Sequence, residues 1–170
     1  MSVEPEVFKR VMRCWASSVA IVTTRVWDAV HGLTVSGFVG ISLEPALVAV
    51  SIGHNQFSHG RIRAGQVYAV NMLRVDQADL SDRFAGRRPN VVDRFRGVEW
   101  HAAATGAPIL DDCLGWFDCR VVAEHEVGDH TLFIGEVLAG QVAGSGQPLV
   151  YFGGDYRPVE EQETATPAEL

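Results

Sequence analysis

The chain has few cysteines, a single lysine and no long apolar run. Its three cysteines, Cys14, Cys113 and Cys119, lack Cys-x-x-Cys spacing, and no signal peptide precedes them. This pattern argues against a disulfide framework and predicts a protein of the reducing cytoplasm. Because Gly, Ser and Asp interrupt the apolar segments, none is long enough to cross a bilayer, and we expect no membrane segment.

Three familiar catalytic signatures are missing as well. The sequence has no Gly-x-Gly-x-x-Gly after a first strand, no phosphate loop ending in Gly-Lys-Ser/Thr and no Gly-x-Ser-x-Gly elbow. Doubly wound dinucleotide folds and serine hydrolases are therefore disfavoured. His125 and His130 lie five residues apart, as do His54 and His59, whereas metal ligation from one helix face requires a spacing of four. We expect no metal site.

What is present fits one acidic, compact domain. The 170 residues are 47% hydrophobic, which is enough for one substantial core, and no linker or repeat divides them. A formal net charge of -7 would repel a phosphate backbone over most of the surface, so nucleic-acid binding is disfavoured. Any anionic ligand must be held by local hydrogen-bond donors.

Apolar periodicity predicts a helix over Glu4–Trp15 that packs on a larger body, and a mainly β chain after it. Two short helices are expected, over Gln56–Ala64 and Gln77–Ala85, and an irregular connection over Gly86–Pro108. The predicted strands are Val19–Thr24, Phe38–Ser42, Leu47–Ile52, Val67–Leu73, Trp116–Glu126, Thr131–Gln141 and Leu149–Phe152. Strands separated by turns rather than crossover helices favour an antiparallel barrel or sandwich.

The most informative stretch is Gly32–Phe38, followed by Ile41–Pro45. Small hydroxyl residues and glycines between strand-like segments offer many short donors and little bulk. Such a segment suits a flat ligand with polar edges, so a cofactor site is the first hypothesis. Taken alone, the same residues would equally suit a β-turn.

An ordered series of segments resembles the split-barrel flavin reductases from about Phe8 to Arg157. The segments are Phe8–Met12, Val19–Thr24, Gly32–Phe38, Ser42–Val48, Tyr68–Leu73, Gln77–Ala85, Gly128–Val137 and Pro148–Phe152. The resemblance implies a six-stranded antiparallel Greek-key split β-barrel with a few flanking helices over residues 1–157. The acidic composition of residues 158–170, which lack apolar periodicity, predicts a disordered tail. It also implies a homodimer that reduces flavin with a pyridine nucleotide and supplies a partner monooxygenase by diffusion of the reduced flavin.

The resemblance further implies which residues hold the flavin. Those matching the segment that lines the isoalloxazine are Thr34, Ser36, Gly37 and Phe38, where Gly37 replaces a serine usual in the family. Those matching the segment that handles the ribityl phosphate are Ser51, Ile52, Asn55 and Ser58. Two further matches near the cofactor are Arg83, as a phosphate ligand, and Phe84. Tyr151 and Tyr156 are expected to wall the pocket or the dimer seam, and His130 to orient the nicotinamide as the catalytic group.

The identities of donor and flavin stay open at this point. NADH is the expected donor because no basic cluster is assigned to a 2'-phosphate, although Arg87, Arg88, Arg94 and Arg96 leave NADPH open. FMN and FAD are not distinguished. Two alternatives remain: a protein of the same fold that keeps its flavin for electron transfer or direct substrate reduction, and a non-catalytic barrel that binds flavin or heme.

Overall fold

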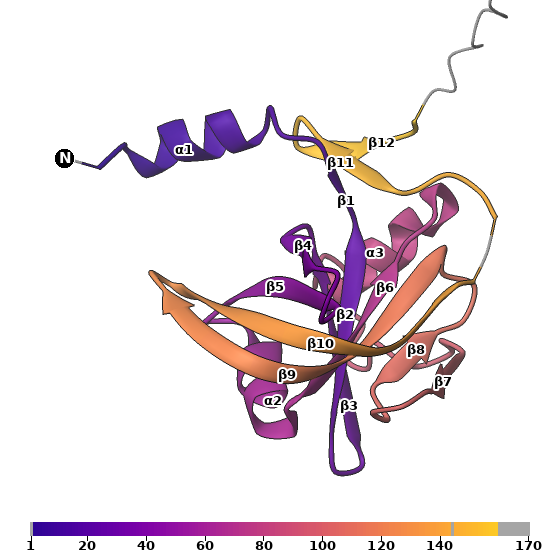
Figure 1. Ribbon diagram of the computed structural model, residues 1–170. Coiled ribbons are helices and arrows are strands. Elements are labelled where there is room, and N and C mark those ends of the chain that lie inside the picture. The colour runs from indigo at the N-terminus through magenta and orange to yellow at the C-terminus, as the bar shows by residue number, and fades with distance from the viewer. Residues whose placement is uncertain (1, 144, 160–170) are drawn as a thin grey trace, which may run out of the picture.

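The protein is described by a computed structural model covering residues 2–143 and 145–159. Most of the predicted acidic tail, residues 160–170, lies outside the described residues. Within them the strands form sheets of seven, three and two strands, with short helices around the largest sheet (Figure 1). No described helix is long and apolar enough to span a membrane.

The elements follow the chain in this order. The helices are α1 (Pro5–Met12), α2 (Phe57–Gly65) and α3 (Ala78–Phe84), with a 3-10 turn at Val75–Gln77. The strands are β1 (Ser17–Ser18), β2 (Ala20–Val26), β3 (Ala29–Val35), β4 (Phe38–Ser42), β5 (Leu47–Gly53), β6 (Val67–Met72), β7 (Trp100–Ala102), β8 (Pro108–Leu110), β9 (Gly115–Val127), β10 (His130–Val142), β11 (Val150–Phe152) and β12 (Asp155–Arg157).

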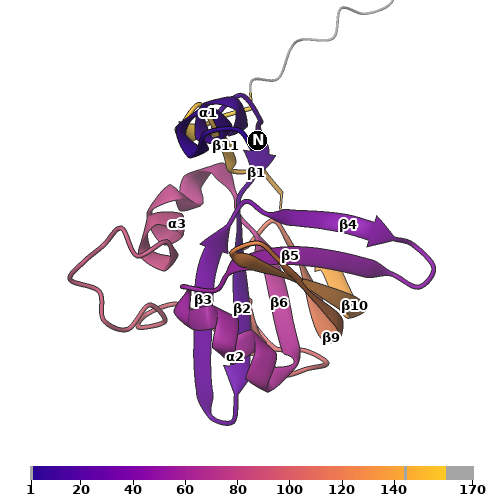
Figure 2. The same ribbon diagram turned by 90° about the vertical axis from the view of Figure 1, so that its left-hand side faces the viewer.

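The large sheet is antiparallel and has the order β3-β2-β6-β9-β10-β5-β4. Its two edge strands, β3 and β4, are consecutive in the chain and are joined only by Ser36 and Gly37. Because this short connection holds the two edges together without pairing them, the sheet rolls into a barrel that is split between β3 and β4 (Figure 2). The split-barrel prediction is confirmed, with seven strands in the sheet rather than six.

The additional strand comes from a hairpin that the sequence did not reveal. Gly32–Val35 was expected in a loop, but Ala29–Val35 forms β3 and pairs with β2 along its whole length. A glycine within a strand usually weakens it. Here a Cβ on Gly32 would lie 2.7 Å from Cε1 of Phe84, so the missing side chain makes room for a buried ring from α3.

The barrel interior is filled by alternating side chains of the large sheet. Tyr68 is fully buried there, and its hydroxyl donates to the carbonyl oxygen of Val48 at 3.2 Å. Across the interior, a Cβ on Gly135 would clash with that hydroxyl oxygen. The glycine therefore leaves the space that the tyrosine occupies, as expected for an interior packed without voids.

A buried polar network fastens the irregular segment after α3 to the barrel. Asn71 in β6 is fully buried, and its amide nitrogen donates to the carbonyl oxygen of Ile21 at 3.0 Å and to the hydroxyl of Thr23 at 3.2 Å. Its amide oxygen accepts from the backbone N–H of Leu110 at 2.8 Å. Thr23 in turn donates to the carbonyl oxygen of Pro108. One side chain thus connects β2, β6 and β8.

The N-terminal helix is shorter than predicted. α1 ends at Met12 rather than Trp15, and none of its residues is buried within this chain. Figure 1 shows it beside the small β1-β11-β12 sheet and apart from the barrel. The helix ends early because Ser17 and Ser18 pair with β11, which requires an extended chain soon after Met12. Its apolar side chains are left exposed.

The three cysteines are free and lie in different surroundings. Cys14 is exposed just after α1, whereas Cys113 and Cys119 are fully buried. Burial raises the pKa of the Cys113 thiol to about 11 and that of the Cys119 thiol to about 12. Both buried thiols are therefore protonated at neutral pH.

Candidate functional site

A cavity of about 350 Å³ opens at the split of the barrel, and we call it the split pocket. It is lined by Leu33, Thr34, Val35, Ser36, Gly37, Ser51, Ile52, Gly53, Gln56, Phe84, Ala85 and His130. Apart from His130, these residues carry no ionisable side chain. Neutral hydroxyls, amides and apolar walls are what a flat, uncharged ring system with polar edges requires.

The floor of the split pocket is formed where β3 passes into β4. The backbone N–H of Ser51 in β5 donates to the carbonyl oxygen of Gly37 at 3.0 Å and holds the connection against the barrel. A Cβ on Gly37 would lie 3.4 Å from Cβ of Ser51, an ordinary contact distance. A side chain at position 37 would therefore cause no clash with Ser51. With glycine there, no side chain covers the backbone of Gly37 where it lines the cavity.

Thr34 in β3 connects the pocket to α3. Its hydroxyl donates to the carbonyl oxygen of Ser81 at 2.6 Å. Because a hydroxyl has one proton and two lone pairs, Thr34 can accept a hydrogen bond from a ligand but has no second proton to donate. The buried ring of Phe84, one turn further along α3, forms an apolar wall beside it.

His130 lies on the opposite side of the split pocket, at the start of β10. It pairs with Gly53 of β5, and a Cβ on that glycine would lie 3.4 Å from Nε2 of His130. Nδ1 of His130 lies 2.7 Å from Oδ1 of Asp129, and this contact lowers the pKa of the Asp129 carboxyl. Asp129 thereby orients the imidazole, leaving Nε2 on the side of Gly53.

An apolar groove of about 650 Å³ adjoins the split pocket below α1. The two cavities share Ser36, Gly37 and Ser51, and the groove adds aromatic rings from β4 and β11, those of Phe38 and Tyr151. Its other wall is the exposed side of α1 and the turn after it, lined by Phe8, Lys9, Met12, Arg13 and Trp15.

A smaller cavity of about 170 Å³ lies on the other side of Ser36. Tyr151 and Tyr156 line it, and the guanidinium carbon of Arg87 lies 5.9 Å and 5.8 Å from their ring centroids. The hydroxyl of Tyr156 donates to Oγ of Ser81 at 2.8 Å, so the β11-β12 hairpin is attached to α3. Burial raises the pKa of the Tyr156 hydroxyl. The tyrosines thus form a rim beside the split pocket.

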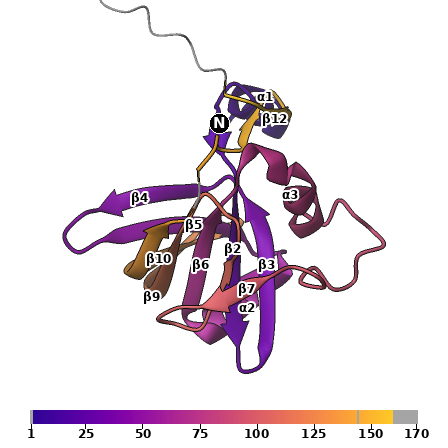
Figure 3. The same ribbon diagram turned by 90° about the vertical axis from the view of Figure 1, so that its right-hand side faces the viewer.

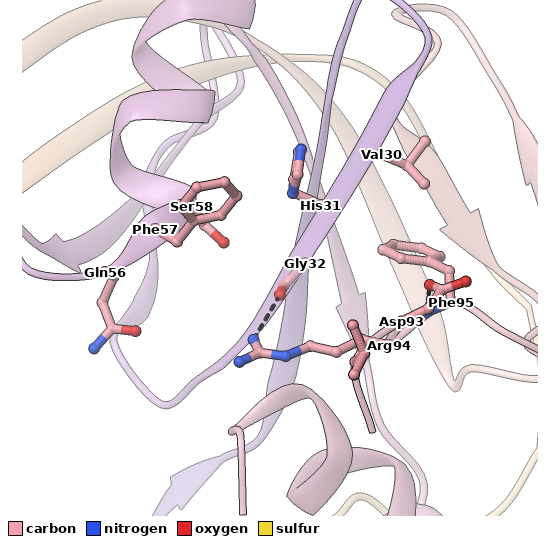
Figure 4. A pocket seen from close by; sticks show the side chains of 10 residues that line it. Val30, His31, Gly32, Gln56, Phe57, Ser58, Asp93, Arg94 and Phe95 are labelled. Carbon is pink, nitrogen blue, oxygen red and sulfur yellow. Dashed lines mark hydrogen bonds between the residues drawn. The ribbon is translucent and has the colours of Figure 1, made fainter. Parts of the chain in front are cut away.

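A fourth cavity, of about 490 Å³, lies between β3, the start of α2 and residues 92–95 of the long connection after α3. We call it the Arg94 pocket (Figure 4). It is lined by Val30, His31, Gly32, Gln56, Phe57, Ser58, Val92, Asp93, Arg94 and Phe95. Gln56 also lines the split pocket, so the two cavities are neighbours.

Comparisons with known proteins identify the family. Residues 12–160 match the profile of the flavin reductase like domain. The chain belongs to the flavin reductase like domain family. It is 38% identical to an NADH-dependent flavin reductase of a Rhodococcus species, over 92% of this chain and 90% of that one. It is 33% identical to HsaB, the reductase subunit of a flavin-dependent monooxygenase of Mycobacterium tuberculosis (strain CDC 1551 / Oshkosh), over 98% and 88%.

Solved flavin reductase structures have the same fold. The native state of the flavin reductase PheA2 superposes with a TM-score of 0.87 at 38% identity, covering 94% of this chain and all of that one. The NADH:FAD oxidoreductase SgcE6 of Streptomyces globisporus, in complex with NAD and FAD fragments, gives a TM-score of 0.85 at 28% identity, with 98% and 99% covered. The resemblance read from the sequence is therefore confirmed.

The flavin reductase fold brings most of the predicted site residues together. Those that line the split pocket are Thr34, Ser36, Gly37, Ser51, Ile52, Phe84 and His130. Phe38 and Tyr151 line the groove that adjoins it, Tyr156 lines the small cavity with Tyr151, and Ser58 lines the Arg94 pocket. Their assembly from distant segments is what the predicted site required.

Asn55 and Arg83 lie outside the linings of all four cavities. Arg83 was expected to reach a phosphate, but its Nη2 donates to the carbonyl oxygens of Asp93 and Arg96. It thereby supports the segment that carries Arg94, which the sequence offered only as one of several arginines. Arg94, rather than Arg83, lines the Arg94 pocket. Sequence reasoning also missed Gln56 and Phe57, which gave no signal beyond their place at a helix start.

Ser36→Val is expected to weaken flavin binding about fivefold, because the change removes a hydroxyl where the split pocket meets the groove and the small cavity. A fluorescence titration with FMN measures the effect. Ser42→Val, at the exposed end of β4, is the matched control. Equal titrations for Ser36→Val and the wild type would place this side chain outside the binding site.

Proposed function

We propose that the protein reduces FMN or FAD with NADH and supplies the reduced flavin to a partner monooxygenase. In this reaction NADH loses a hydride to the flavin and becomes NAD⁺. The observation that carries the proposal is the split pocket, where neutral donors and acceptors lie opposite an oriented histidine in a flavin reductase fold. Relatives named as reductase subunits of monooxygenases support the partner.

The lining residues have distinct roles in this proposal. Thr34, Ser36, Gly37 and Ser51 bind the polar edges of the isoalloxazine, while Ile52, Phe38 and Phe84 cover its apolar surface. Ser58 lies at the helix start that faces the ribityl phosphate. His130 orients the nicotinamide through Nε2. The enzyme requires no protein nucleophile, since it needs only to hold two rings in contact and exclude other geometries.

An aerobic assay of NADH and NADPH oxidation, with riboflavin, FMN and FAD as acceptors, tests the function. We expect saturable NADH oxidation that depends on added flavin, and slower oxidation of NADPH. A protein that purifies yellow and gains little from added flavin would instead keep its cofactor for electron transfer. If the absorption spectrum shows that flavin or heme binds but NADH is not oxidised, the protein is a non-catalytic barrel.

We also propose that the protein is a homodimer of the cytoplasm. The support for a dimer is the exposed apolar surface of α1 and β4, where Val11 is 64% and Ile41 49% exposed. A second copy would cover this surface and the groove below α1. The support for the cytoplasm is that all three cysteines are free.

Charged substitutions test the dimer. Val11→Glu and Ile41→Glu are expected to shift the protein from dimer to monomer in sedimentation velocity, because each places a carboxylate in the covered surface. Val127→Glu, at the tip of the β9-β10 hairpin and also exposed, is the control and should leave the dimer intact. A wild-type protein that sediments as a monomer would contradict the proposal.

A further inference from the structure

We propose that the preferred flavin of this protein is FAD, because the Arg94 pocket binds the adenosine diphosphate half of that molecule. The inference rests on the proposed function, since it places the isoalloxazine in the split pocket. Gln56 lines both cavities, so a ligand leaving the split pocket along this residue enters the Arg94 pocket (Figure 4).

The size of the Arg94 pocket exceeds what FMN requires. FMN ends in one phosphate group, whereas the cavity of about 490 Å³ is larger than the split pocket itself. It falls within the range of roughly 300–1,000 Å³ that is usual for pockets holding a whole small molecule. The adenosine diphosphate half of FAD, whose adenosine FMN lacks, is of a size that fills this cavity.

Arg94 supplies a cation suited to a pyrophosphate. Its Nη1 donates to the carbonyl oxygens of Phe84 at 2.8 Å and Gly32 at 3.2 Å, which fixes the guanidinium beside β3. Because an arginine has five N–H donors, others remain for phosphate oxygens after these two bonds. The half-buried position of Arg94 strengthens such contacts in a protein whose net charge is negative.

Phe57 supplies an aromatic surface for adenine. Phe57 is 68% exposed, and the guanidinium carbon of Arg61 lies 4.8 Å from the centroid of its ring and covers one face. His31 meets the ring edge-on at a centroid distance of 5.2 Å. Burial and the nearby Arg61 lower the pKa of His31, so this imidazole packs as a neutral group. The rest of the exposed ring is available for stacking with a base.

Asp93 is the one lining residue whose charge opposes phosphate. Its Oδ1 accepts from the backbone N–H of Phe95 at 2.9 Å. In Figure 4 it lies beyond Arg94 as seen from Gln56, the residue that also lines the split pocket. The pyrophosphate therefore belongs on the Gln56 side of Arg94, and the carboxylate is suited to a ribose hydroxyl.

Equilibrium titrations of the full-length protein with riboflavin, FMN and FAD test the inference. We expect the wild type to bind FAD about tenfold more tightly than FMN, the effect of one stacked base. Phe57→Ala should raise the Kd for FAD about tenfold and that for FMN less than twofold. Trp27→Ala, which removes an exposed ring from the β2-β3 turn outside all four cavities, is the matched control.

Arg94 is tested by substitution to lysine, which keeps the charge but not the paired donors. Arg94→Lys should weaken binding of FAD more than that of riboflavin, and ADP should compete with FAD in the wild type but less well in this variant. A thermal melt accompanies the titration because Arg94 also binds two carbonyl oxygens. If the melt shows the variant unfolded, the Phe57→Ala titrations decide alone.

Three results would overturn the inference. The first is equal affinity of the wild type for FMN and FAD, and the second is an equal loss of both flavins in Phe57→Ala. The third is a raised KM for NADH in Phe57→Ala, measured with FMN as acceptor, together with unchanged FAD affinity, which would assign the pocket to the dinucleotide donor. If no flavin supports NADH oxidation, the proposed function fails while the FAD-to-FMN affinity ratio still tests the pocket.

Discussion

His130→Ala is expected to lower the turnover of NADH-dependent flavin reduction about 10- to 100-fold, with flavin affinity near that of the wild type. His130 contacts the split pocket from the side opposite the hydroxyl residues of β3, and Asp129 fixes its ring through Nδ1. Without the imidazole, the nicotinamide ring of NADH can adopt unproductive positions, and such misplacement lowers the rate of hydride transfer. Stopped-flow reduction at saturating NADH measures the effect.

Two variants sharpen the test of His130. His130→Asn keeps a hydrogen-bonding group near the pocket and should recover part of the lost rate. His125→Ala removes an exposed imidazole from the same β9-β10 hairpin, away from all four cavities, and should behave as the wild type. Turnover that is unchanged in His130→Ala would remove this residue from the mechanism, whereas a large loss of flavin affinity would make it a binding residue.

Asn71→Leu is expected to lower the free energy of unfolding by about 3 kcal/mol, one of the larger effects available from a single side chain. The substitution keeps the number and branching of the side-chain heavy atoms but leaves the N–H of Leu110 without its acceptor. The carbonyl oxygen of Ile21 and the hydroxyl of Thr23 lose their donor in the same change. All of these groups lie where water cannot replace the lost partner.

Urea denaturation followed by tryptophan fluorescence measures this loss of stability. Asn55→Leu, which changes an exposed asparagine in the same way, is the control and should alter the free energy of unfolding by less than about 0.5 kcal/mol. Equal urea midpoints for Asn71→Leu and Asn55→Leu would show that the buried network contributes no more to the free energy of unfolding than an exposed amide does. A fall in cooperativity alone would indicate that only the segment ending in β8 detaches.

The β architecture could be predicted because its signals are local. The runs at Leu47–Ile52 and Val67–Leu73 carry β-branched residues bounded by turns, and they form β5 and β6 nearly as expected. That Ser36, Gly37 and His130 line one pocket could be predicted because they belong to segments whose order matches a family, and their roles in binding and catalysis stay predictions. That match identifies which distant segments meet, and no local pattern does so.

The missed features depend on contacts between distant parts of the chain. In the sequence, Gly32 is typical of a turn. Only the packing of Phe84 against it explains why a glycine lies within a strand at this position. The α1 periodicity correctly indicates an apolar face, but periodicity does not reveal whether the same chain covers it. Arg94 reaches Gly32 from an irregular segment 62 residues later, where no repeat or motif indicates its position. Figure 3 shows this segment as part of the long connection that leaves α3.

The burial of Cys113 and Cys119 has a consequence for an enzyme that makes reduced flavin. Oxygen oxidises free reduced flavin and is itself converted to hydrogen peroxide. Hydrogen peroxide oxidises thiolates much faster than thiols. With pKa values of about 11 and about 12, these two side chains are almost entirely in the unreactive form. The two buried thiols are thereby protected from a by-product of the enzyme's own chemistry, and oxidative damage should begin at the exposed Cys14.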